Sequence, residues 1–272
     1  MYTVQDHPDI IPRGDSSEHL NLVRKLERQR RDLESLNNEL NHFTYVAAHA
    51  LKEPLRTLSS YIRKFVNTNR RLLDDESLNN AGCILEINEQ MTTLIAGLLE
   101  YSRVTRPSCG WHNVQDIVNE VLFMMDRRIK RGNVKILCHS LNEEVLCDKV
   151  QLLQVFQNLI SNGIKFRKKG QGTIIEIAKE TSEDERYNYF YARDNGRGIG
   201  QEDFDKIFQM FSRGSNIVTD GMSANGSGIG LAVCRKVVER HGGRIWVESK
   251  ENKGSTFHFT LLKNPVNGKN GA

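Results

Sequence analysis

The motif "FQNLISNGIKF", residues 156–166, lies in a pattern that predicts a helix over residues 149–168. Asn158 and Asn162 are one turn apart, and Lys165 follows one turn later on nearly the same face. Amide oxygens in that arrangement can hold a hydrated magnesium ion while an ammonium group neutralises phosphate oxygens. Asparagines on a helix face are mostly solvated, so this spacing alone does not decide between a ligand site and an exposed surface.

Two glycine-rich stretches follow this motif. In "RDNGRGIG", residues 193–200, Asp194 ends a predicted strand and precedes Gly196, Gly198 and Gly200. Glycines allow tight turns and close approach of the backbone to a ligand. A carboxylate at such a position can accept a hydrogen bond from an exocyclic amine. The alternative is that Asp-Asn-Gly simply forms a hairpin turn.

The second glycine-rich stretch is "GSGIGLA", residues 226–232, which runs directly into a predicted helix. Backbone amides and a helix N-terminus form an anion site suited to a chain of phosphates, here around Gly226, Gly228 and Gly230. No strand precedes these glycines, so they do not fit a Rossmann fingerprint. The polar, aperiodic segment 209–227 is predicted to be a long mobile loop, which is typical of a lid over a site.

The C-terminal half of the chain mixes helical and strand patterns. Helices are predicted over residues 115–130 and 149–168, with Asp148 as the N-cap of the second, and a further helix ends at Gly242 and Gly243. Alternating apolar and polar residues predict five strands: "VKILCH", "GTIIEIAKET", "RYNYFYARD", "RIWVES" and "STFHFTL". Strands joined by hairpins and covered by helices on one side belong to the α+β class and form an α/β sandwich, here over residues 113–264.

Apolar residues repeat at alternating spacings of four and three in the N-terminal part of the chain. This seam is formed by Leu22, Leu26, Gln29, Leu33, Leu36, Leu40, Phe43 and Ala47. The pattern predicts a dimerising coiled coil over residues 20–43, and the alternative is a single amphipathic helix that packs on its own domain. Residues 1–19 and 265–272 show no such pattern and are predicted to be a disordered tail at each end.

The stretch "YVAAHALKEPLRTL", residues 45–58, continues this seam through Ala47 and Ala50 and sets His49 outside it. A histidine outside the apolar seam is accessible to a partner molecule. Pro54 lacks a backbone donor and clashes with the preceding turn, so we expect the helix to bend just beyond His49, as a hinge would. Most exposed helical histidines have no special role, and these residues alone leave that alternative open.

A second helix follows, and its apolar face is formed by Ile84, Ile87, Met91, Leu94, Leu98 and Tyr101. Two antiparallel helices per chain predict, in a dimer, a four-helix bundle over residues 44–104. Pro107, Ser108 and Gly110 then break the pattern and predict a linker over residues 105–112.

The composition argues against several classes of protein. Among 272 residues, 38 basic and 34 acidic side chains are interspersed and give a net charge of +4, which implies neither a nucleic acid nor an anionic membrane as partner. Five scattered cysteines without CxxC spacing indicate reduced thiols. No segment has the apolar length of a membrane span or of a signal peptide. We therefore expect no direct membrane contact and a cytoplasmic localisation, although a longer parent protein could carry a membrane anchor.

Five motifs follow one another in a characteristic order: "FQNLISNGIKF", "DNGRGIG", "IFQMF", "GSGIGLA" and "GSTFHFTL". In order and spacing they resemble the ATP-binding boxes of the sensor histidine kinases. The helical hairpin with "AHALKEPLR" resembles the dimerisation and phosphoacceptor domain of the same family, so the similarity extends over residues 20–264. It implies a homodimer through the hairpin and the coiled coil, a sensor module upstream that this chain lacks, and the receiver domain of a response regulator as partner.

The resemblance also implies a division of labour, with ATP and Mg²⁺ as cofactors. His49 would be the phosphoacceptor. Asn158 and Asn162 would hold the magnesium ion, Lys165 would contact the phosphates, and Asp194 would accept a hydrogen bond from adenine. The other residues that it implies are Thr256 near the base, Arg213 at the γ-phosphate, the glycines of the pocket and lid, Gly196, Gly198, Gly226, Gly228 and Gly230, and the aromatic pair Phe208 and Phe211 beneath the lid.

The chain departs from the family pattern next to the phosphoacceptor, where Ala50 replaces the usual acid. That acid resembles a general base that takes the imidazole proton, so we expect autophosphorylation to be slow, while alanine leaves the helix unstrained. Gly163 stands where alanine is usual, and Ala48 stands where serine is common. Glu53 stands where dedicated phosphatases carry threonine or asparagine, which argues against strong phosphatase activity.

Two other functions fit parts of this pattern. Gyrase-like or chaperone-like clamp ATPases share the nucleotide fold but lack a helical hairpin with an outward histidine. A catalytically impaired dimeric scaffold, which binds nucleotide without transferring phosphate, gains weight from Ala50. The sequence favours a histidine kinase core that transfers phosphate from ATP to His49 and then to an aspartate of a response regulator, with the first step weakened by Ala50.

Overall fold

The computed structural model describes residues 15–168, 170–212 and 226–263. Residues 1–14 and 265–272 of the predicted tails lie outside these ranges, whereas residues 15–19, predicted to be part of a disordered tail, belong to the first helix. None of the helices in the described part of the chain combines the length and the apolarity that crossing a bilayer requires.

The chain divides into two compact units, Met1–Thr44 and Tyr45–Ala272. Helix α1 (Asp15–Asn69) begins in the first unit and ends in the second. Within the first unit, the apolar side chains of the predicted heptad seam are exposed to solvent; they are Leu22, Leu26, Leu33, Leu36, Leu40 and Phe43. Exposed apolar residues at heptad spacing leave the seam available to a second chain, and the coiled coil stays a prediction.

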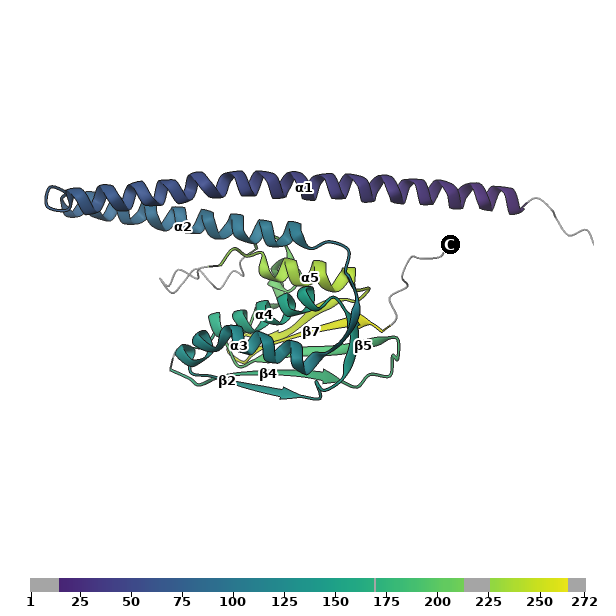
Figure 1. Cartoon of the computed structure of the whole chain (residues 1–272). Coiled ribbons are helices and arrows are strands. Elements are labelled where there is room, and N and C mark those ends of the chain that lie inside the picture. Colours follow the sequence, from purple (N-terminus) through teal and green to yellow (C-terminus); the bar gives the residue numbers. More distant parts are fainter. Residues whose placement is uncertain (1–14, 169, 213–225, 264–272) are drawn as a thin grey trace, which may run out of the picture. The chain divides into compact units, whose positions relative to one another are not determined.

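The second unit begins with a helical hairpin, in which the C-terminal part of α1 lies beside helix α2 (Asp75–Arg103) (Figure 1). Asp74 caps α2, because its side chain accepts a hydrogen bond from the backbone N–H of Ser77 at 2.9 Å. Buried and half-buried residues of α2 repeat at heptad spacing; they are Ala81, Leu85, Asn88, Thr92, Ile95, Leu99 and Ser102. Ile95 and Leu99 pack against Ala48 of α1, so this heptad seam faces α1.

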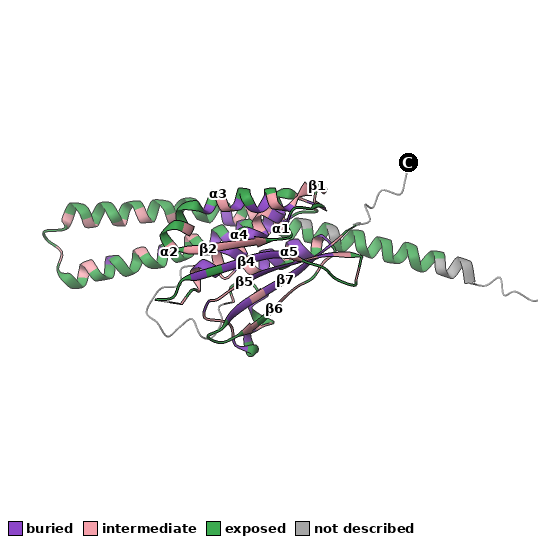
Figure 2. Ribbon diagram, turned by 90° about the horizontal axis from the view of Figure 1, so that it is seen from below, coloured by how far each residue is buried: buried purple, intermediate pink, exposed green. Residues whose placement is uncertain are grey.

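The apolar face that the sequence predicts for α2 is used only in part within the chain. Ile84, Ile87 and Met91 are 47%, 57% and 47% exposed. Leu98 and Tyr101, at the other end of the same face, pack against the core of the C-terminal domain. Figure 2 shows the same contrast, because the hairpin is exposed or half-buried along most of its length while the sheet and its helices carry the buried residues. A second chain could cover the exposed part, as the predicted four-helix bundle requires.

Helix α1 continues through Pro54 without interruption. Proline has no N–H to donate to the carbonyl of Ala50, so one hydrogen bond of the helix is missing at this turn. The hinge predicted here stays a prediction.

The rest of the second unit is an α/β sandwich. Its five-stranded sheet has the order β2-β4-β5-β7-β6, and the strands are β2 (Val134–His139), β4 (Thr173–Glu180), β5 (Tyr187–Asp194), β6 (Ile245–Lys250) and β7 (Gly254–Leu262). Each agrees with its predicted strand to within one residue at either end. The helices that cover one face of the sheet are α3 (Val114–Gly132), α4 (Lys149–Lys165) and α5 (Gly230–Arg240) (Figure 1).

Two features of the sheets differ from the expectation of strands joined by hairpins. β2 pairs with β4 in parallel, which is possible because α4 lies between them in the chain as a crossover. β1 (Gly110–Asn113) and β3 (Glu144–Cys147), which were not predicted, form a separate antiparallel pair. Since β1 lies in the predicted linker over residues 105–112, the sandwich begins at Gly110 rather than at residue 113.

Aromatic side chains join the helices to the sheet in one core. Phe156 of α4 and Phe259 of β7 are fully buried, with ring centroids 5.6 Å apart, and Phe190 of β5 stacks on Phe259 at 5.1 Å. Side chains alternate between the two faces along a strand, so every second residue of β5 and β7 points into this core. Cys147 and Cys234 are free thiols in the same interior, and burial raises the pKa of both to about 12.

The predicted helix caps are present at α4 and α5. The Asp148 side chain accepts a hydrogen bond from the backbone N–H of Gln151 at 3.1 Å, although α4 ends at Lys165 rather than at residue 168. Gly242 follows α5 with a φ of +73°, and the N–H of Gly243 donates to the carbonyl of Val238 at 3.0 Å, as in a Schellman motif.

His241 connects the start of α4 to the end of α5. Its Nδ1 donates to the carbonyl of Val237 at 2.8 Å, and its Nε2 accepts from the backbone N–H of Asp148 at 3.0 Å. Both bonds together require the neutral imidazole with its hydrogen on Nδ1. Burial lowers the pKa of His241 below its ordinary value, and the hydrogen bond to Val237 and the charge of Asp148 oppose this only in part.

We expect the melting temperature to fall as the pH is lowered through the range in which histidine titrates. The unfolded chain binds a proton at His241 more readily than the folded chain. The stabilisation is therefore present above the ordinary histidine pKa of about 6.5 and is lost as the pH falls towards the lower folded-state pKa. Calorimetry between about pH 8 and pH 5 should show a shallower slope for His241→Gln than for the native chain, and equal slopes would contradict the assignment.

Candidate nucleotide-binding site

Helix α4 carries three of the predicted ligands along one side. The Nδ2 of Asn158 donates to the backbone carbonyl of Gly230 at 3.3 Å, and a Cβ at Gly230 would lie 3.1 Å from the Oδ1 of Asn158. Asn162 is half-buried one turn later. The Nζ of Lys165 lies 4.7 Å from the centroid of the Phe166 ring at the end of the helix. The packing of α4 on α5 thus brings Asn158 to the first residue of α5.

Asp194 is the last residue of β5 and is half-buried. Its Oδ1 accepts a hydrogen bond from the backbone N–H of Gly196 at 2.7 Å. Burial raises the pKa of this carboxyl group, while hydrogen bonds from the backbone of Gly196 and Ser255 and the charge of Lys168 act in the opposite direction. A carboxylate has lone pairs beyond those used here, so Asp194 can also accept from an exocyclic amine.

Gly163 brings α4 close to the end of the sheet. A Cβ at this position would lie 2.7 Å from the Cδ1 of Ile175 and 3.5 Å from the Cβ of Asp194. The first distance is too short for two carbon atoms, so alanine, the residue expected in the family, would force Ile175 to shift. The departure at Gly163 therefore has a packing reason, because the absence of a side chain lets α4 approach Ile175 and Asp194 closely.

The loop after Asp194 depends on its glycines. Gly198 has a φ of +74°, and a Cβ there would lie 2.1 Å from the carbonyl oxygen of Lys250. A Cβ at Gly196 would lie 2.7 Å from the carbonyl oxygen of Phe166. Both contacts are with backbone atoms, which cannot move aside as a flexible side chain can. The loop is thus pressed between the end of α4 and the turn that follows β6.

The alternative that Asp-Asn-Gly forms a hairpin turn is wrong. β5 is followed by two short 3₁₀ helices, η1 (Gln201–Asp203) and η2 (Lys206–Phe208), and not by a strand. The neighbours of β5 in the sheet are β4 and β7.

The second glycine-rich stretch leads from Gly226 into α5, whose first residue is Gly230. Gly228 has a φ of +67°, and a Cβ there would lie 2.8 Å from the carbonyl oxygen of Ser212. These glycines combine a tight turn with a helix N-terminus beside Asn158. That is the arrangement expected of a loop that holds phosphates.

Thr256 does not lie where its predicted role requires. It pairs with Arg193 in the ladder between β5 and β7, and the Nε of Arg193 donates to its hydroxyl at 3.3 Å. Because side chains alternate along a strand, Thr256 points to the face of the sheet opposite to that of Asp194. Ser255 is the direct partner of Asp194 in the ladder and shares its face, with its hydroxyl 2.9 Å from that of Ser249. Ser255 therefore replaces Thr256 as the candidate hydroxyl near the base.

The residues predicted at the lid are only partly visible. Arg213 and most of the lid segment 209–227 lie outside the described residues. Phe208 is buried and meets Phe257 edge-on, with ring centroids 6.4 Å apart. Phe211 is 52% exposed, so one ring of the predicted aromatic pair joins the core and the other is exposed to solvent. Packing of the pair beneath the lid stays a prediction.

His49 is exposed on α1, as the sequence predicts. Its ring lies beside that of Tyr45, one turn earlier, with centroids 6.3 Å apart. The residue that faces α2 at this level is Ala48, which is 1% exposed, whereas Ala50, predicted at a seam position, is exposed in the chain. His49 is thus presented outward from a turn that is anchored by the residue before it.

Comparison with known proteins supports this description. Residues 147–265 match the family described as histidine kinase-, DNA gyrase B- and HSP90-like ATPase. The cyanobacterial phytochrome B of Nostoc sp. strain PCC 7120 is 37% identical over 232 residues, which make up 85% of this chain and 30% of that protein. The methanogenesis regulatory histidine kinase FilI of Methanothrix harundinacea is 31% identical over 242 residues, 87% of this chain and 26% of that protein.

Among solved structures, one of the histidine kinase ThkA in complex with the response regulator protein TrrA is 26% identical, with a TM-score of 0.57. The match covers 90% of this chain and 67% of that one. The chain spans about a third of the length of the first curated relatives that it matches.

The sandwich, with glycine loops beside Asn158 and Asp194, is an ATPase domain of the histidine kinase, gyrase and HSP90 class. A helical hairpin with an exposed histidine precedes it, and relatives named as histidine kinases match both parts. The chain belongs to the sensor histidine kinase family.

Proposed function

We propose that this chain is the catalytic core of an ATP-dependent protein-histidine kinase. An imidazole nitrogen of His49 attacks the γ-phosphorus of ATP, the bond from that phosphorus to the β–γ bridging oxygen breaks, and ADP leaves. The imidazole N–H proton passes to solvent. A carboxylate oxygen of an aspartate on a response regulator then attacks the phosphorus, the phosphorus–nitrogen bond breaks, and the imidazole of His49 leaves and takes up a proton from solvent. Such transfers depend chiefly on positioning and on neutralisation of charge.

The observation that carries this proposal is the presentation of His49. Its neighbour Ala48 is 1% exposed against Ile95 and Leu99, so the turn is fixed on one side while the imidazole faces outward. A nucleophile for a phosphorus atom held on another domain must be exposed in this way and must also be held in place. Because the chain belongs to the histidine kinase family, the proposed donor of the phosphoryl group is ATP.

The residues of the sandwich suit ATP and Mg²⁺. Asn158 and Asn162 offer neutral amide oxygens, which are hard ligands of the kind that Mg²⁺ accepts together with water and phosphate oxygens. The described residues include no group of three or more His, Cys, Asp or Glu side chains that could hold an ion without the nucleotide. A bound Mg²⁺ would neutralise the β- and γ-phosphates, with Lys165 beside them. Asp194 would accept from the amino group of adenine, and Ser255 would lie near the base.

We further propose that Ala50 slows the first transfer. It offers no carboxylate to take the imidazole proton. Glu53, one turn after His49, is exposed, and its carboxylate lies 3.4 Å from the guanidinium of Arg56. Glu53 is four residues from His49 and does not replace an acid directly beside the imidazole. The phosphoryl transfer would then depend on solvent as proton acceptor.

The partners belong to the same proposal. The exposed face of Ile84, Ile87 and Met91 and the heptad seam of α1 suit a second copy of the chain. A receiver domain as acceptor of the phosphoryl group is supported by the similarity to ThkA, whose structure contains a response regulator. The small net charge of +4 gives no reason to propose a nucleic acid as partner.

We expect His49→Gln to abolish labelling of the protein by γ-labelled ATP, because glutamine has no nucleophilic ring nitrogen. Affinity for ATP should change by less than about twofold, since His49 stands outside the nucleotide site. The label on the native chain should be labile in acid and stable in alkali, as expected of a phosphoramidate. Equal labelling of both chains would refute His49 as the acceptor.

The same assay separates the alternatives. Ala50 favours a dimeric scaffold that binds nucleotide without transferring phosphate; such a protein would bind ATP and show no label on either chain. A clamp-type ATPase would release inorganic phosphate at the same rate from the native chain and from His49→Gln.

A further inference from the structure

Asn88 is a buried amide at the centre of the α1–α2 seam. It is 2% exposed, while the residues one heptad before and after it on α2, Ala81 and Ile95, are apolar. A polar residue at one position of an apolar heptad seam is known to specify the register of two helices at some cost in stability. We therefore expect the buried amide of Asn88 to have a hydrogen-bond partner on the other helix.

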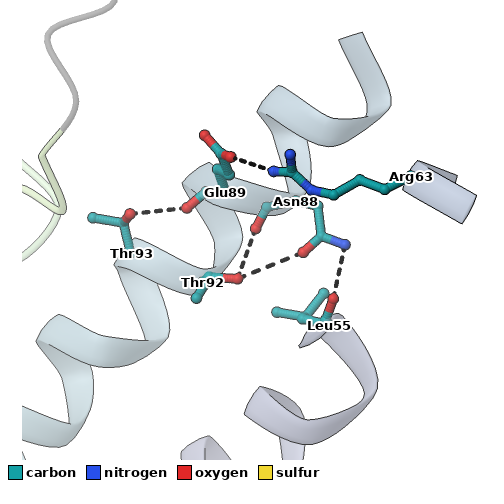
Figure 3. A network of polar contacts seen from close by, with 6 residues as sticks. All are labelled: Leu55, Arg63, Asn88, Glu89, Thr92 and Thr93. Carbon is teal, nitrogen blue, oxygen red and sulfur yellow. Dashed lines mark hydrogen bonds and ion pairs between the residues drawn. The ribbon is translucent and has the colours of Figure 1, made fainter. Parts of the chain in front are cut away.

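The partner of Asn88 is the backbone of α1 (Figure 3). Its Nδ2 donates to the carbonyl oxygen of Leu55 at 3.0 Å. The hydroxyl of Thr92, one turn later on α2, donates to the backbone carbonyl of Asn88 at 2.9 Å and lies 3.5 Å from its Oδ1. Thr92 on α2 thus orients the side-chain amide of Asn88, and this amide donates a hydrogen bond to α1.

The hydrogen bond to Leu55 lies next to an irregularity of α1, because Leu55 directly follows Pro54. The ring of Pro54 crowds the carbonyl of Ala50 and removes one hydrogen bond from the turn of α1 that precedes Leu55, so this turn is weaker than an uninterrupted one. A carbonyl oxygen has two lone pairs and can accept from a neighbouring side chain. Asn88 therefore fastens α1 to α2 directly after the turn that Pro54 weakens.

The neighbouring ion pair does not fix the register of α1 against α2. Arg63 and Glu89 lie 3.0 Å apart, but their side chains are 58% and 61% exposed (Figure 3). Exposed pairs between long side chains contribute little and tolerate sliding of the helices. A short buried side chain tolerates neither sliding nor rotation, because either would leave its donor unpaired.

The geometry points to Asn88 as a positioning residue for His49, an inference that rests on the proposed phosphoacceptor role of His49. His49 lies on α1 between two contacts with α2: Ala48 against Ile95 and Leu99, and Leu55 against Asn88. A slip of α1 by one residue would move the imidazole by about 1.5 Å along the helix and turn it by about 100°. Asn88 holds α1 in the register at which His49 faces outward.

The decisive variant is Asn88→Leu, which completes the apolar seam and removes the bond to Leu55. We expect an unchanged or higher melting temperature, because a buried polar group gives way to an apolar one in a heptad seam. The kcat of autophosphorylation should nevertheless fall by about 10- to 100-fold, with the KM for ATP within about twofold, since a misplacement of about 1 Å at the reacting atom has effects of this size. If Asn88 served stability alone, a variant of equal stability would keep its kcat, and the inference would be overturned.

Hydrogen exchange provides a readout that does not require kinase activity. Amides of residues 50–58 should exchange faster in Asn88→Leu than in the native chain, while exchange in the sandwich domain stays unchanged. Asn80→Leu is the matched control, because Asn80 is an exposed asparagine on the same helix; it should leave both kcat and exchange at native values. Unchanged exchange around Pro54 in Asn88→Leu would overturn the inference, whereas equal labelling of native chain and His49→Gln would overturn the phosphoacceptor role instead.

Discussion

Replacement of Ala50 by glutamate is expected to raise the rate constant of autophosphorylation by about 10²- to 10⁴-fold, the usual contribution of a positioned general base. Ala50 directly follows His49, and its side chain is exposed. A longer side chain there does not enter the core, and glutamate is a good helix former. The carboxylate can reach the N–H of the adjacent imidazole and take the proton as the nitrogen attacks phosphorus. Single-turnover labelling with saturating γ-labelled ATP measures the rate constant.

Ala50→Gln is the matched control for this change. Glutamine has nearly the same shape and helix propensity as glutamate but cannot accept the proton. Its rate constant should stay within about threefold of that of the native chain. If the glutamine variant were as fast as the glutamate variant, the gain would come from packing and not from base catalysis. If neither were faster, the absence of an acid beside His49 would not limit the reaction.

The elements of the sandwich could be predicted because local and global preferences agree there. In β5 and β7 the alternation of core residues with polar ones matches one buried face, and the strand limits followed to within one residue. Asp148 and Gly242 mark helix ends by their own chemistry, as an acceptor for free N–H groups and as a residue that adopts positive φ. Such signals are contained in a few neighbouring residues.

The misplaced elements depend on contacts between distant residues. β1 and β3 are four residues long each, and they form only because the two strands meet each other. The parallel pairing of β2 with β4 depends on the crossover through α4. On α2, the sequence predicts one apolar face through Ile84, Ile87 and Met91, whereas the face towards α1 is formed by residues such as Ala81 and Asn88. When a helix has two apolar faces, its sequence alone does not show which face packs within the chain and which stays exposed for a partner.

The candidate site shows the same division. Asn158, Asn162, Lys165 and Asp194 could be selected as candidates because motif spacing fixes which residues share a helix face or end a strand. The choice between Ser255 and Thr256, adjacent residues with a hydroxyl each, depends on the register of β7 against Asp194. A shift by one residue moves a side chain to the opposite face of the sheet. Motif matching that ignores the strand register can therefore select a residue on the wrong face. Alternation from Phe257, a core residue, would have selected Ser255.

Asp194→Asn is expected to weaken ATP binding by about 100-fold or more. The carboxylate offers a charged acceptor to the amino group of adenine in a half-buried site, and hydrogen bonds to charged groups are the stronger ones. The asparagine that replaces it would turn either a neutral oxygen or its own NH₂ group towards that amine. The fold should persist, because an amide oxygen can still accept from the N–H of Gly196, now at 2.7 Å from Oδ1. Isothermal titration with a non-hydrolysable ATP analogue measures the dissociation constant.

A change of base distinguishes loss of recognition from general damage to the site. Inosine triphosphate carries a carbonyl where ATP carries the amino group, so the native carboxylate should disfavour it strongly, as a site built for one hydrogen-bonding pattern does. The amide introduced by Asp194→Asn can donate to that carbonyl, and the preference for adenine over hypoxanthine should shrink towards unity or reverse. Asp184→Asn is the control, because Asp184 is paired with Arg186 at 2.8 Å and should have no effect on either nucleotide. A variant that bound both nucleotides more weakly but kept the native preference would show that Asp194 supports the loop and does not read the base.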